Sequence, residues 1–227
     1  MDRRYGYRFV WGPGTIGSIT WLPQNAAKLH RIEYGLVAVL LGDAGNFTYK
    51  KSRRGDASID RIARYVVEAR AGRTVEFDPF SYDERQFCSP GFDLPVGRLT
   101  RTPNGEYAEY HSSADDLSFV MAERLAESLQ VCLEIVDVIE HDQRFLNRHP
   151  KGEPKLVRRG LYRKLGGERL PERELAMLWL LNQSDGTQSL LDVAERATLP
   201  FNLIRNTCAE LVEAGLLEPV KDNAGTQ

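Results

Sequence analysis

The spacing of apolar residues divides the chain into a first part of strands and helices and a second part of helices. In the first part, apolar runs predict strands at residues 5–11, 34–41, 73–77 and 94–99. The run at 34–41, YGLVAVLL, is apolar at nearly every position. Such a run is typical of a strand that is buried on both faces of a parallel or mixed sheet.

Apolar residues that recur every three or four positions predict three helices in the same part of the chain. The first lies at 15–30, and Pro23 is expected to interrupt it. The second lies at 56–70, with Asp56 as a candidate N-cap. The third starts at Leu117 and is expected to run for about six turns. Strands that alternate with helices predict an α/β domain in which helices cover a sheet.

A polar stretch at residues 141–155, which contains proline and glycine, predicts a connection between two domains. We therefore expect a first domain at residues 1–145, a linker at 146–167 and a second domain at 168–220. In the second domain, three short helical patterns are separated by Ser-Asp-Gly and Thr-Leu-Pro, and Gly215 ends the last of them. This pattern predicts a winged helix-turn-helix.

The charge of the chain disfavours a nucleic-acid partner. The 227 residues carry a formal net charge of −2. The second domain contains nine acidic and four basic residues, a net charge of −5, and its expected recognition helix at 201–214 has Arg205 as its one basic residue. A DNA-binding domain normally has a basic surface, so we expect packing or protein contact instead.

Cysteine content and hydropathy favour a cytoplasmic protein without a membrane partner. Cys88, Cys132 and Cys208 are widely spaced and form no Cys-x-x-Cys pair. An odd number of such cysteines indicates neither a disulfide framework nor a zinc knuckle. The N-terminus lacks the apolar segment of a signal peptide, and no run of 18 apolar residues occurs.

Three loops of the first domain carry candidate site residues. Asp43 follows the most apolar run, so its carboxylate is expected at the carboxyl end of a strand, where such sheets bind ligands. A simple Asx-turn is the alternative for this residue. Glu84 lies in a long acidic loop at 80–95, and His111 lies in a long loop at 101–116. Loops of this length in a compact domain tend to be functional, although His111 is also compatible with a surface position.

A group of basic residues follows the Asp43 loop, in the segment YKKSRRGD at 49–56. A solvated basic face is one interpretation of such a run. The other is that arginines bind an anionic group of a substrate, such as a carboxylate, by forked hydrogen bonds. On that interpretation the candidate substrate-binding residues are Arg53 and Arg54 of this segment and Arg101, which begins the loop that contains His111.

Four segments, taken in order, resemble a bacterial aminopeptidase-like family of unknown function. This family is related to the two-zinc peptidases of the leucyl aminopeptidase and glutamate carboxypeptidase type. The resemblance covers nearly the whole chain, because members also carry a winged helix after the peptidase-like domain. It implies a partial zinc-aminopeptidase-like mixed sheet flanked by helices. The segments are GTIGSITWL (14–22), LLGDAGNFTYKKSRRGD (40–56), YDERQFCSPGFDLPVGRL (82–99) and RTPNGEYAEYHSSADD (101–116).

The resemblance implies a zinc cofactor and a peptide or amide-like substrate. In zinc aminopeptidases an aspartate after a strand and a late histidine are metal ligands, and these positions fall on Asp43 and His111. Zinc accepts both ligand types, and a two-metal site activates water and polarises the scissile carbonyl. Asp115 or Asp116 is a candidate for orienting the ring of His111. Tyr110 is a weak candidate for holding a substrate oxygen, with simple packing as the alternative.

Two departures from the family pattern indicate an incomplete site. The family has a Glu-Glu pair just before the segment that GTIGS (14–18) resembles, but here Trp11, Gly12 and Pro13 stand there. A general base must reach the proton that it removes, so other glutamates would have to replace it, with Glu84, Glu106 and Glu109 as candidates. The family's first histidine ligand and its bridging aspartate would precede Met1.

The chain therefore resembles the carboxyl-terminal half of a larger protein. We expect a zinc aminopeptidase-like hydrolase domain that is incomplete and inactive as this chain alone. A non-catalytic binding or assembly module and a winged-helix DNA-binding regulator are the alternatives. A sheet divided in this way exposes strand edges and apolar surface. This implies either a homo-oligomer or a partner that supplies the missing N-terminal half.

Overall fold

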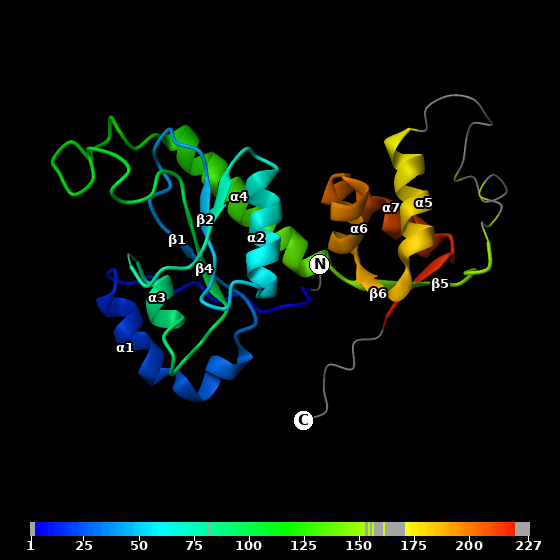
Figure 1. Ribbon diagram of the computed structural model, residues 1–227, viewed down its shortest axis with the longest axis horizontal. Helices are drawn as coiled ribbons and strands as arrows, with labels where there is room; N and C mark the ends of the chain where they lie inside the picture. The colour runs from blue at the N-terminus through cyan, green and yellow to red at the C-terminus, as the bar shows by residue number, and fades with distance from the viewer. Residues whose placement is uncertain are drawn as a thin grey trace. The chain divides into compact units, whose positions relative to one another are not determined.

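The chain forms two compact units, Met1–Ile139 and Glu140–Gln227, each with its own sheet (Figure 1). The computed structural model describes residues 3–80, 82–152, 154, 156, 161 and 171–220. The first unit is a mixed α/β domain, and the second is a winged helix-turn-helix. This is the fold class that the sequence predicts.

A four-stranded mixed sheet lies at the centre of the first unit, in the order β1-β4-β2-β3. β1 is parallel to β4 and β2 is parallel to β3, whereas β2 runs antiparallel to β4. β1 and β3 are therefore the edge strands among the described residues. The strands are β1 (Gly35–Ala38), β2 (Thr48–Lys50), β3 (Arg73–Val75) and β4 (Val96–Thr100).

Helices cover this sheet, as the apolar spacing predicts (Figure 1). They are α1 (Ile16–Gln24), the 3-10 helix η1 (Ala26–Arg31), α2 (Ser58–Glu68), α3 (Glu84–Phe87) and α4 (Ala122–His141). The predicted apolar face of α2 is buried: Ile59, Ile62, Ala63, Val66 and Val67. α1, η1 and α3 share a core cluster with β4: Leu22, Leu29, Cys88, Leu94 and Val96.

The strand predicted at residues 5–11 is wrong. This segment has no strand assignment, and its side chains Phe9 and Trp11 are 79% and 91% exposed. A strand needs a neighbour to satisfy its backbone groups, and none of the described strands pairs with this segment. In contrast, β2 was not predicted, because its three residues lie within a run that reads as a basic loop.

Asp60, rather than Asp56, holds the start of α2, so the predicted cap is also wrong. Asp60 accepts a hydrogen bond from the backbone N–H of Ala57, the N-cap residue, at 3.1 Å. It also accepts from the hydroxyl of Tyr49 at 2.9 Å and from the backbone and hydroxyl of Ser52 at 2.6 Å each. Asp60 is 2% exposed, so this carboxylate joins the end of β2 to α2 inside the protein. Burial, followed by the charge of Asp60, raises the pKa of Tyr49.

Among its described residues, the second unit has three antiparallel strands and three helices, which confirms the predicted winged helix-turn-helix. The strand order is β6-β5-β7, and Gly215 follows the last helix with a φ of 69°. Residues 168–170 and most of the predicted linker lie outside the described residues. The elements are β5 (Arg144–Asn147), α5 (Glu172–Gln183), β6 (Asp185–Ser189), α6 (Leu190–Ala197), α7 (Phe201–Glu213) and β7 (Leu217–Pro219).

Within the described part of the chain, none of the helices combines the length and the apolar composition that a membrane crossing requires.

We predict that Asp60→Ala lowers the free energy of unfolding by about 3 kcal/mol, because it leaves buried donors of Tyr49 and Ser52 without an acceptor. Urea unfolding followed by circular dichroism measures this change. The exposed Asp56 is the matched control, and Asp56→Ala should change stability by less than about 0.5 kcal/mol. Equal effects of the two substitutions would contradict the assignment of the cap to Asp60.

Candidate functional site

The start of α1 is bonded to the turn that precedes α3. Asp83 Oδ1 accepts a hydrogen bond from the backbone N–H of Thr15 at 2.9 Å and from the hydroxyl of Ser18 at 2.5 Å. A carboxylate at this place also interacts favourably with the positive end of the helix dipole. Asp83 therefore holds the GTIGS segment against the segment that begins with Tyr82, although Thr15 and Asp83 are 68 positions apart.

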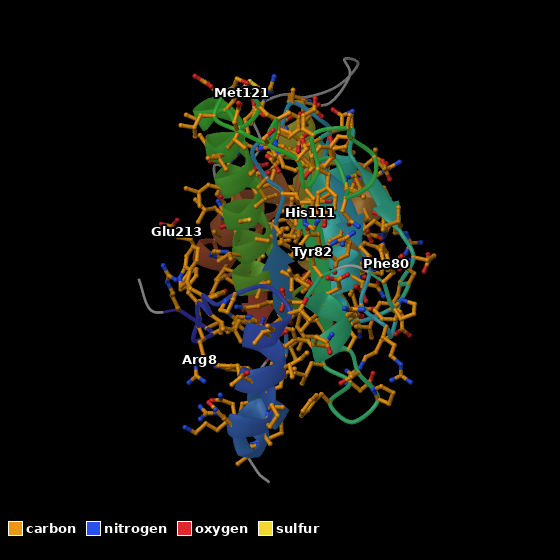
Figure 2. The ribbon with its side chains drawn as sticks, turned by 90° about the vertical axis from the view of Figure 1, so that its left-hand side faces the viewer. Arg8, Phe80, Tyr82, His111, Met121 and Glu213 are labelled. Carbon is orange, nitrogen blue, oxygen red and sulfur yellow. The ribbon has the colours of Figure 1, made fainter. Side chains whose placement is uncertain are left out.

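A second hydrogen bond joins the same turn to the loop that contains His111. The hydroxyl of Tyr82 donates to the hydroxyl of Tyr110 at 3.0 Å. The Tyr110 ring stacks on the His111 ring, with 3.9 Å between the centroids. Burial, followed by the hydrogen bond to Tyr110, raises the pKa of Tyr82. Figure 2 shows Tyr82 and His111 close together on the side of the molecule that faces the viewer.

Two more aromatic residues build the His111 loop. The Tyr107 ring stacks on Phe119 at 5.1 Å and meets Tyr110 edge-on at 5.6 Å. Burial raises the pKa of Tyr107 to about 12. His111 is exposed and has a φ of +57°, a backbone conformation that residues other than glycine rarely adopt. The loop is thus held by aromatic contacts in place of regular secondary structure.

Asp43 bonds the loop after β1 to the start of the His111 loop. Its Oδ1 accepts hydrogen bonds from Gly45 N–H at 2.6 Å and from the hydroxyl of Thr102 at 2.7 Å. Its Oδ2 accepts from Thr102 N–H at 3.2 Å. Asp43 is 4% exposed. The bond to Gly45 is the Asx-turn that the sequence allowed as an alternative, and the bonds to Thr102 are an addition that sequence reasoning missed.

These contacts link all four segments that carry the family resemblance. Asp83 links the first segment to the third, the two tyrosines link the third to the fourth, and Asp43 links the second to the fourth. Asp83 and Tyr82 appeared in the sequence only as members of an acidic loop. No local signal marks their role, because their partners lie 28 to 68 positions away.

A buried group of charges lies beside Tyr82. Lys50 Nζ is 3.0 Å from Glu84 Oε1 and 3.3 Å from Asp78 Oδ1, and Arg98 Nη1 is 3.7 Å from the same oxygen of Glu84. The side chains of Lys50, Glu84 and Arg98 are 2%, 0% and 5% exposed. The guanidinium of Arg98 lies over the Tyr82 ring, 5.6 Å from its centroid. Glu84, the candidate general base, is therefore a buried partner of two cations.

Lysine and arginine are the main partners of this carboxylate. Neither oxygen of Glu84 accepts a hydrogen bond of good geometry from the described residues. Lys50 Nζ in turn donates to the backbone oxygen of Phe80 at 2.7 Å. The charge of Glu84 is stable in the interior only while the neighbouring cations remain, since an unpaired buried charge is costly.

The three arginines predicted to bind substrate all have partners within the chain. Arg53 and Arg54 form ion pairs with Asp93, at 2.9 and 3.3 Å. Arg101 is 3% exposed and donates to Gly45 O at 2.8 Å and to Ser128 Oγ at 3.1 Å, so it connects the Asp43 loop to α4. These contacts give the arginines structural roles, and substrate binding by them stays a prediction.

The described residues do not by themselves form a zinc site. Among them, no group of three or more His, Cys, Asp or Glu side chains is close enough to hold a metal ion. A catalytic zinc site needs at least three protein ligands. Both oxygens of Asp43 accept hydrogen bonds within the chain, and Asp116, one of the two candidate partners of the His111 ring, accepts from Ser118. Zinc binding by Asp43 and His111 stays a prediction.

The remaining candidate residues have other surroundings. Of the glutamates considered as replacements for the general base, Glu106 pairs with Arg73 and Glu109 is half-buried. In the second unit, Arg205 is the one basic residue of α7 and its Nε donates to Asn206 at 3.2 Å. α7 therefore lacks the basic surface that DNA binding requires.

Known proteins share this two-part organisation. Residues 1–142 match the family described as a domain of unknown function (DUF4910), and residues 143–219 match a winged helix-turn-helix family. A relative from Clostridium acetobutylicum is named as a candidate polysaccharide biosynthesis protein with an aminopeptidase-like domain. It is 44% identical over 223 residues, which are 97% of this chain and 51% of the relative.

A crystal structure of a candidate peptidase from the same organism superposes on this chain with a TM-score of 0.88. The two are 41% identical, and the match covers 97% of this chain and 50% of that chain. The chain therefore spans about half the length of both similar proteins. This confirms the resemblance to the carboxyl-terminal half of an aminopeptidase-like protein.

We predict that Lys50→Met lowers the free energy of unfolding by about 3 to 5 kcal/mol, because it leaves the buried Glu84 with a more distant cation. The double substitution Lys50→Met/Glu84→Gln should cost less than the sum of the single ones, with a coupling of about 1 to 3 kcal/mol. Denaturant unfolding of the four proteins gives this cycle. Lys51→Met is the matched control, since Lys51 pairs with the exposed Glu76 and should contribute less than about 1 kcal/mol.

We also predict that Asp83→Ala loosens the start of α1, because it removes the acceptor for Thr15 and Ser18. Hydrogen exchange of the peptides that cover residues 15–24 should become about tenfold faster. Asp83→Asn keeps one acceptor oxygen and should fall between the variant and the unchanged protein. Unchanged exchange in Asp83→Ala would show that this contact does not hold the helix.

Proposed function

Because the chain belongs to the DUF4910 family over residues 1–142, we propose that it supplies the carboxyl-terminal part of an aminopeptidase-like hydrolase domain. The substrate class in this proposal is a peptide or another amide. The named relative with an aminopeptidase-like domain and the candidate peptidase of known structure support it. Hydrolysis requires the remaining part of the domain, since this chain spans about half of either protein.

The observation that carries the proposal is the convergence of the four resembling segments. Asp83, the Tyr82–Tyr110 pair and Asp43 connect them by hydrogen bonds across 28 to 68 positions of sequence. Segments that have only structural roles need not meet at one place. Here each contact joins two of the four segments, and two of the three contacts involve the loop that presents His111, where an aminopeptidase-like site is expected.

Tyr110 is the residue with the clearest part to play in substrate binding. Its hydroxyl accepts from Tyr82 at 3.0 Å and therefore keeps its own proton for another acceptor. The raised pKa of Tyr82 keeps that donor protonated at neutral pH. In this proposal Tyr110 donates a hydrogen bond to the carbonyl oxygen of the substrate, an interaction that strengthens as negative charge develops on that oxygen.

The chain's own carboxylates explain why we propose no hydrolysis by this chain alone. Glu84 is fully buried in its ion pairs, and Glu106 pairs with Arg73. The described residues do not by themselves form a zinc centre, so no step is assigned to a metal. In the assembled domain, the proposal is that Asp43 and His111 contribute two of the zinc ligands and that the remaining part supplies the rest and the general base.

The proposed location of the protein is the cytoplasm. Cys88, Cys132 and Cys208 are free, which supports the cytoplasm as the location.

A non-catalytic binding module is the second candidate function, and the position of Glu84 in a buried ion pair favours it. The two functions differ in whether the assembled domain turns over an amide.

We predict that a covalent chimera restores hydrolysis. In it, this chain replaces the matched half of the Clostridium relative. Supplied with zinc, the chimera should cleave aminoacyl-amide substrates, and the chain alone should not. Tyr110→Phe in the chimera should lower kcat by about 10- to 100-fold with a smaller change in KM, because the lost hydrogen bond strengthens in the transition state.

His111→Ala in the chimera should remove bound zinc, measured by elemental analysis, and lower kcat/KM by at least about 100-fold. His30 is exposed and lies in η1, so His30→Ala is the matched control and should retain both. A folded chimera that binds zinc but cleaves none of the amides tested would refute the hydrolase and favour the binding module.

A further inference from the structure

α4 has a second apolar face that the described residues of the first unit do not cover. Leu125, Leu129 and Leu133 follow one another at intervals of four residues and are 47%, 60% and 52% exposed. The face that α4 turns to the core is separate from them, with Val131 and Ile135 buried. A surface helix normally has one apolar stripe and a polar opposite face. The second stripe therefore needs an explanation beyond the packing of this unit.

β1 is one of the two edge strands of the sheet, and no described strand pairs with its outer edge. Gly35 N–H donates to Pro95 O and Val39 N–H donates to Leu99 O, so these groups point toward β4. The N–H groups of Leu36 and Ala38 point the opposite way, because successive residues of a strand alternate. Edge strands usually carry charges, prolines or bulges that prevent pairing. The β1 sequence Gly-Leu-Val-Ala contains neither a charge nor a proline.

The segment at residues 9–11 adds a third exposed apolar part. Phe9, Val10 and Trp11 are 79%, 48% and 91% exposed. They belong to the apolar run at residues 5–11 that predicts a strand, yet no described strand pairs with them. The segment follows Tyr5, whose ring packs edge-on against Tyr34 at 5.4 Å between centroids, and Tyr34 directly precedes β1.

The α4 stripe also begins beside the loop that follows β1. A Cβ atom placed on Gly42, four residues after β1 ends, would lie 3.5 Å from Leu125 Cδ2. The hydroxyl of Ser128 in α4 donates to Leu41 O at 2.8 Å. Figure 2 views this side of the molecule, with the blue strand β1 and the green helix α4 toward the viewer. We call these parts together the β1-edge surface: residues 9–11, the edge of β1, Leu125, Leu129 and Leu133.

We propose that the β1-edge surface binds the N-terminal half of the aminopeptidase-like domain, in the form of the half of the Clostridium relative that this chain does not match. The inference rests on the proposed function in that it names the partner that completes the same site. The partner adds a strand to β1 by main-chain hydrogen bonds and covers the leucines of α4. The unmatched half of the relative is about as long as the matched half, which is enough to cover such a surface.

A second copy of this chain fits the surface less well as the occupant. Two copies would bring two identical edges together but would add neither a general base nor new ligand types, because both copies have the same site residues. In the candidate peptidase that shares this fold at a TM-score of 0.88, the unmatched half belongs to the same polypeptide as the matched half. A strand pattern without a strand partner at residues 5–11 is also expected where the neighbouring part of a sheet is missing.

The test is complementation in trans. This chain and the unmatched half of the Clostridium relative are co-expressed as separate polypeptides, with an affinity tag on the half from the relative. We expect a 1:1 complex by size-exclusion chromatography with light scattering. Recovery of the tagged half alone would overturn the inference, and so would a homodimer of this chain that excludes it.

Leu129→Asp should weaken the complex at least about tenfold, since it places a charge at the centre of the apolar stripe. Leu129 is 60% exposed, so the substitution removes little core packing, and thermal unfolding of the variant checks this. Val212 lies on α7 in the second unit and is 37% exposed, so Val212→Asp is the matched control and should leave binding unchanged. Equal binding by both variants would contradict this location of the interface.

A labelling measurement on the covalent chimera avoids dependence on the solubility of the separate half. Leu129→Cys in a Cys132→Ser background should react with a maleimide at least about tenfold more slowly in the chimera than in this chain alone. Val212→Cys should react equally in both. Equal rates for Leu129→Cys would overturn the inference.

The outcome separates the interface from the proposed function, because neither measurement involves a substrate. A complex that is sensitive to Leu129→Asp but does not hydrolyse amides keeps the inference and refutes the hydrolase. A chimera that hydrolyses amides while Leu129→Cys stays reactive keeps the hydrolase and refutes the interface.

Discussion

Carboxylates that are buried or half-buried hold the segments of the first unit together, because the short strands of its sheet form few backbone hydrogen bonds. β2 and β3 have three residues each, and the long segments between the strands have few backbone ladders. Asp60 joins β2 to α2, Asp83 joins α1 to the turn before α3, and Asp43 joins the loop after β1 to the His111 loop. Each carboxylate accepts hydrogen bonds from N–H groups or hydroxyls that would otherwise lack an acceptor, and these hydrogen bonds stabilise its charge.

The same bonds decide what the site residues are able to do. Asp43 is positioned by three hydrogen bonds from Gly45 and Thr102, and a metal ion would compete with those donors for the same oxygens. His111 and Tyr110, by contrast, lie on a loop held by stacked rings, and Tyr110 keeps a proton to donate. In the proposed peptidase site, the residues of this chain are therefore better prepared for binding a substrate oxygen than for holding a metal alone.

Local signals in the sequence predicted much of the fold but little of the site's construction. The helices of the second unit were predicted because capping and turn residues mark their ends; Gly215, for example, takes a positive φ where α7 stops. Asp56 and Asp60 show the limit of such signals. Both precede or begin the same helix, and only the positions of Tyr49 and Ser52 decide which carboxylate is buried. The strand predicted at 5–11 failed for a related reason, since a strand depends on a neighbour that its own sequence does not contain.

Hydrogen bonds connect the loop that follows β1 to the site and to α4, so binding of a partner at the edge of β1 and the geometry of the site are coupled. Asp43 follows β1 by five residues, and Arg101 bonds Gly45 on one side and Ser128 and Glu127 of α4 on the other. A partner that pairs with β1 and covers α4 therefore contacts both ends of this connection. If the Asp43 loop differs between the free chain and the complex, binding of the partner changes the affinity of the site for a ligand. The ligand then changes the affinity for the partner by the same factor, because coupling between two sites is reciprocal. While the edge of β1 is free, the carboxylate hydrogen bonds hold the Asp43 loop in one stable arrangement. A partner that pairs with β1 is positioned to change that arrangement.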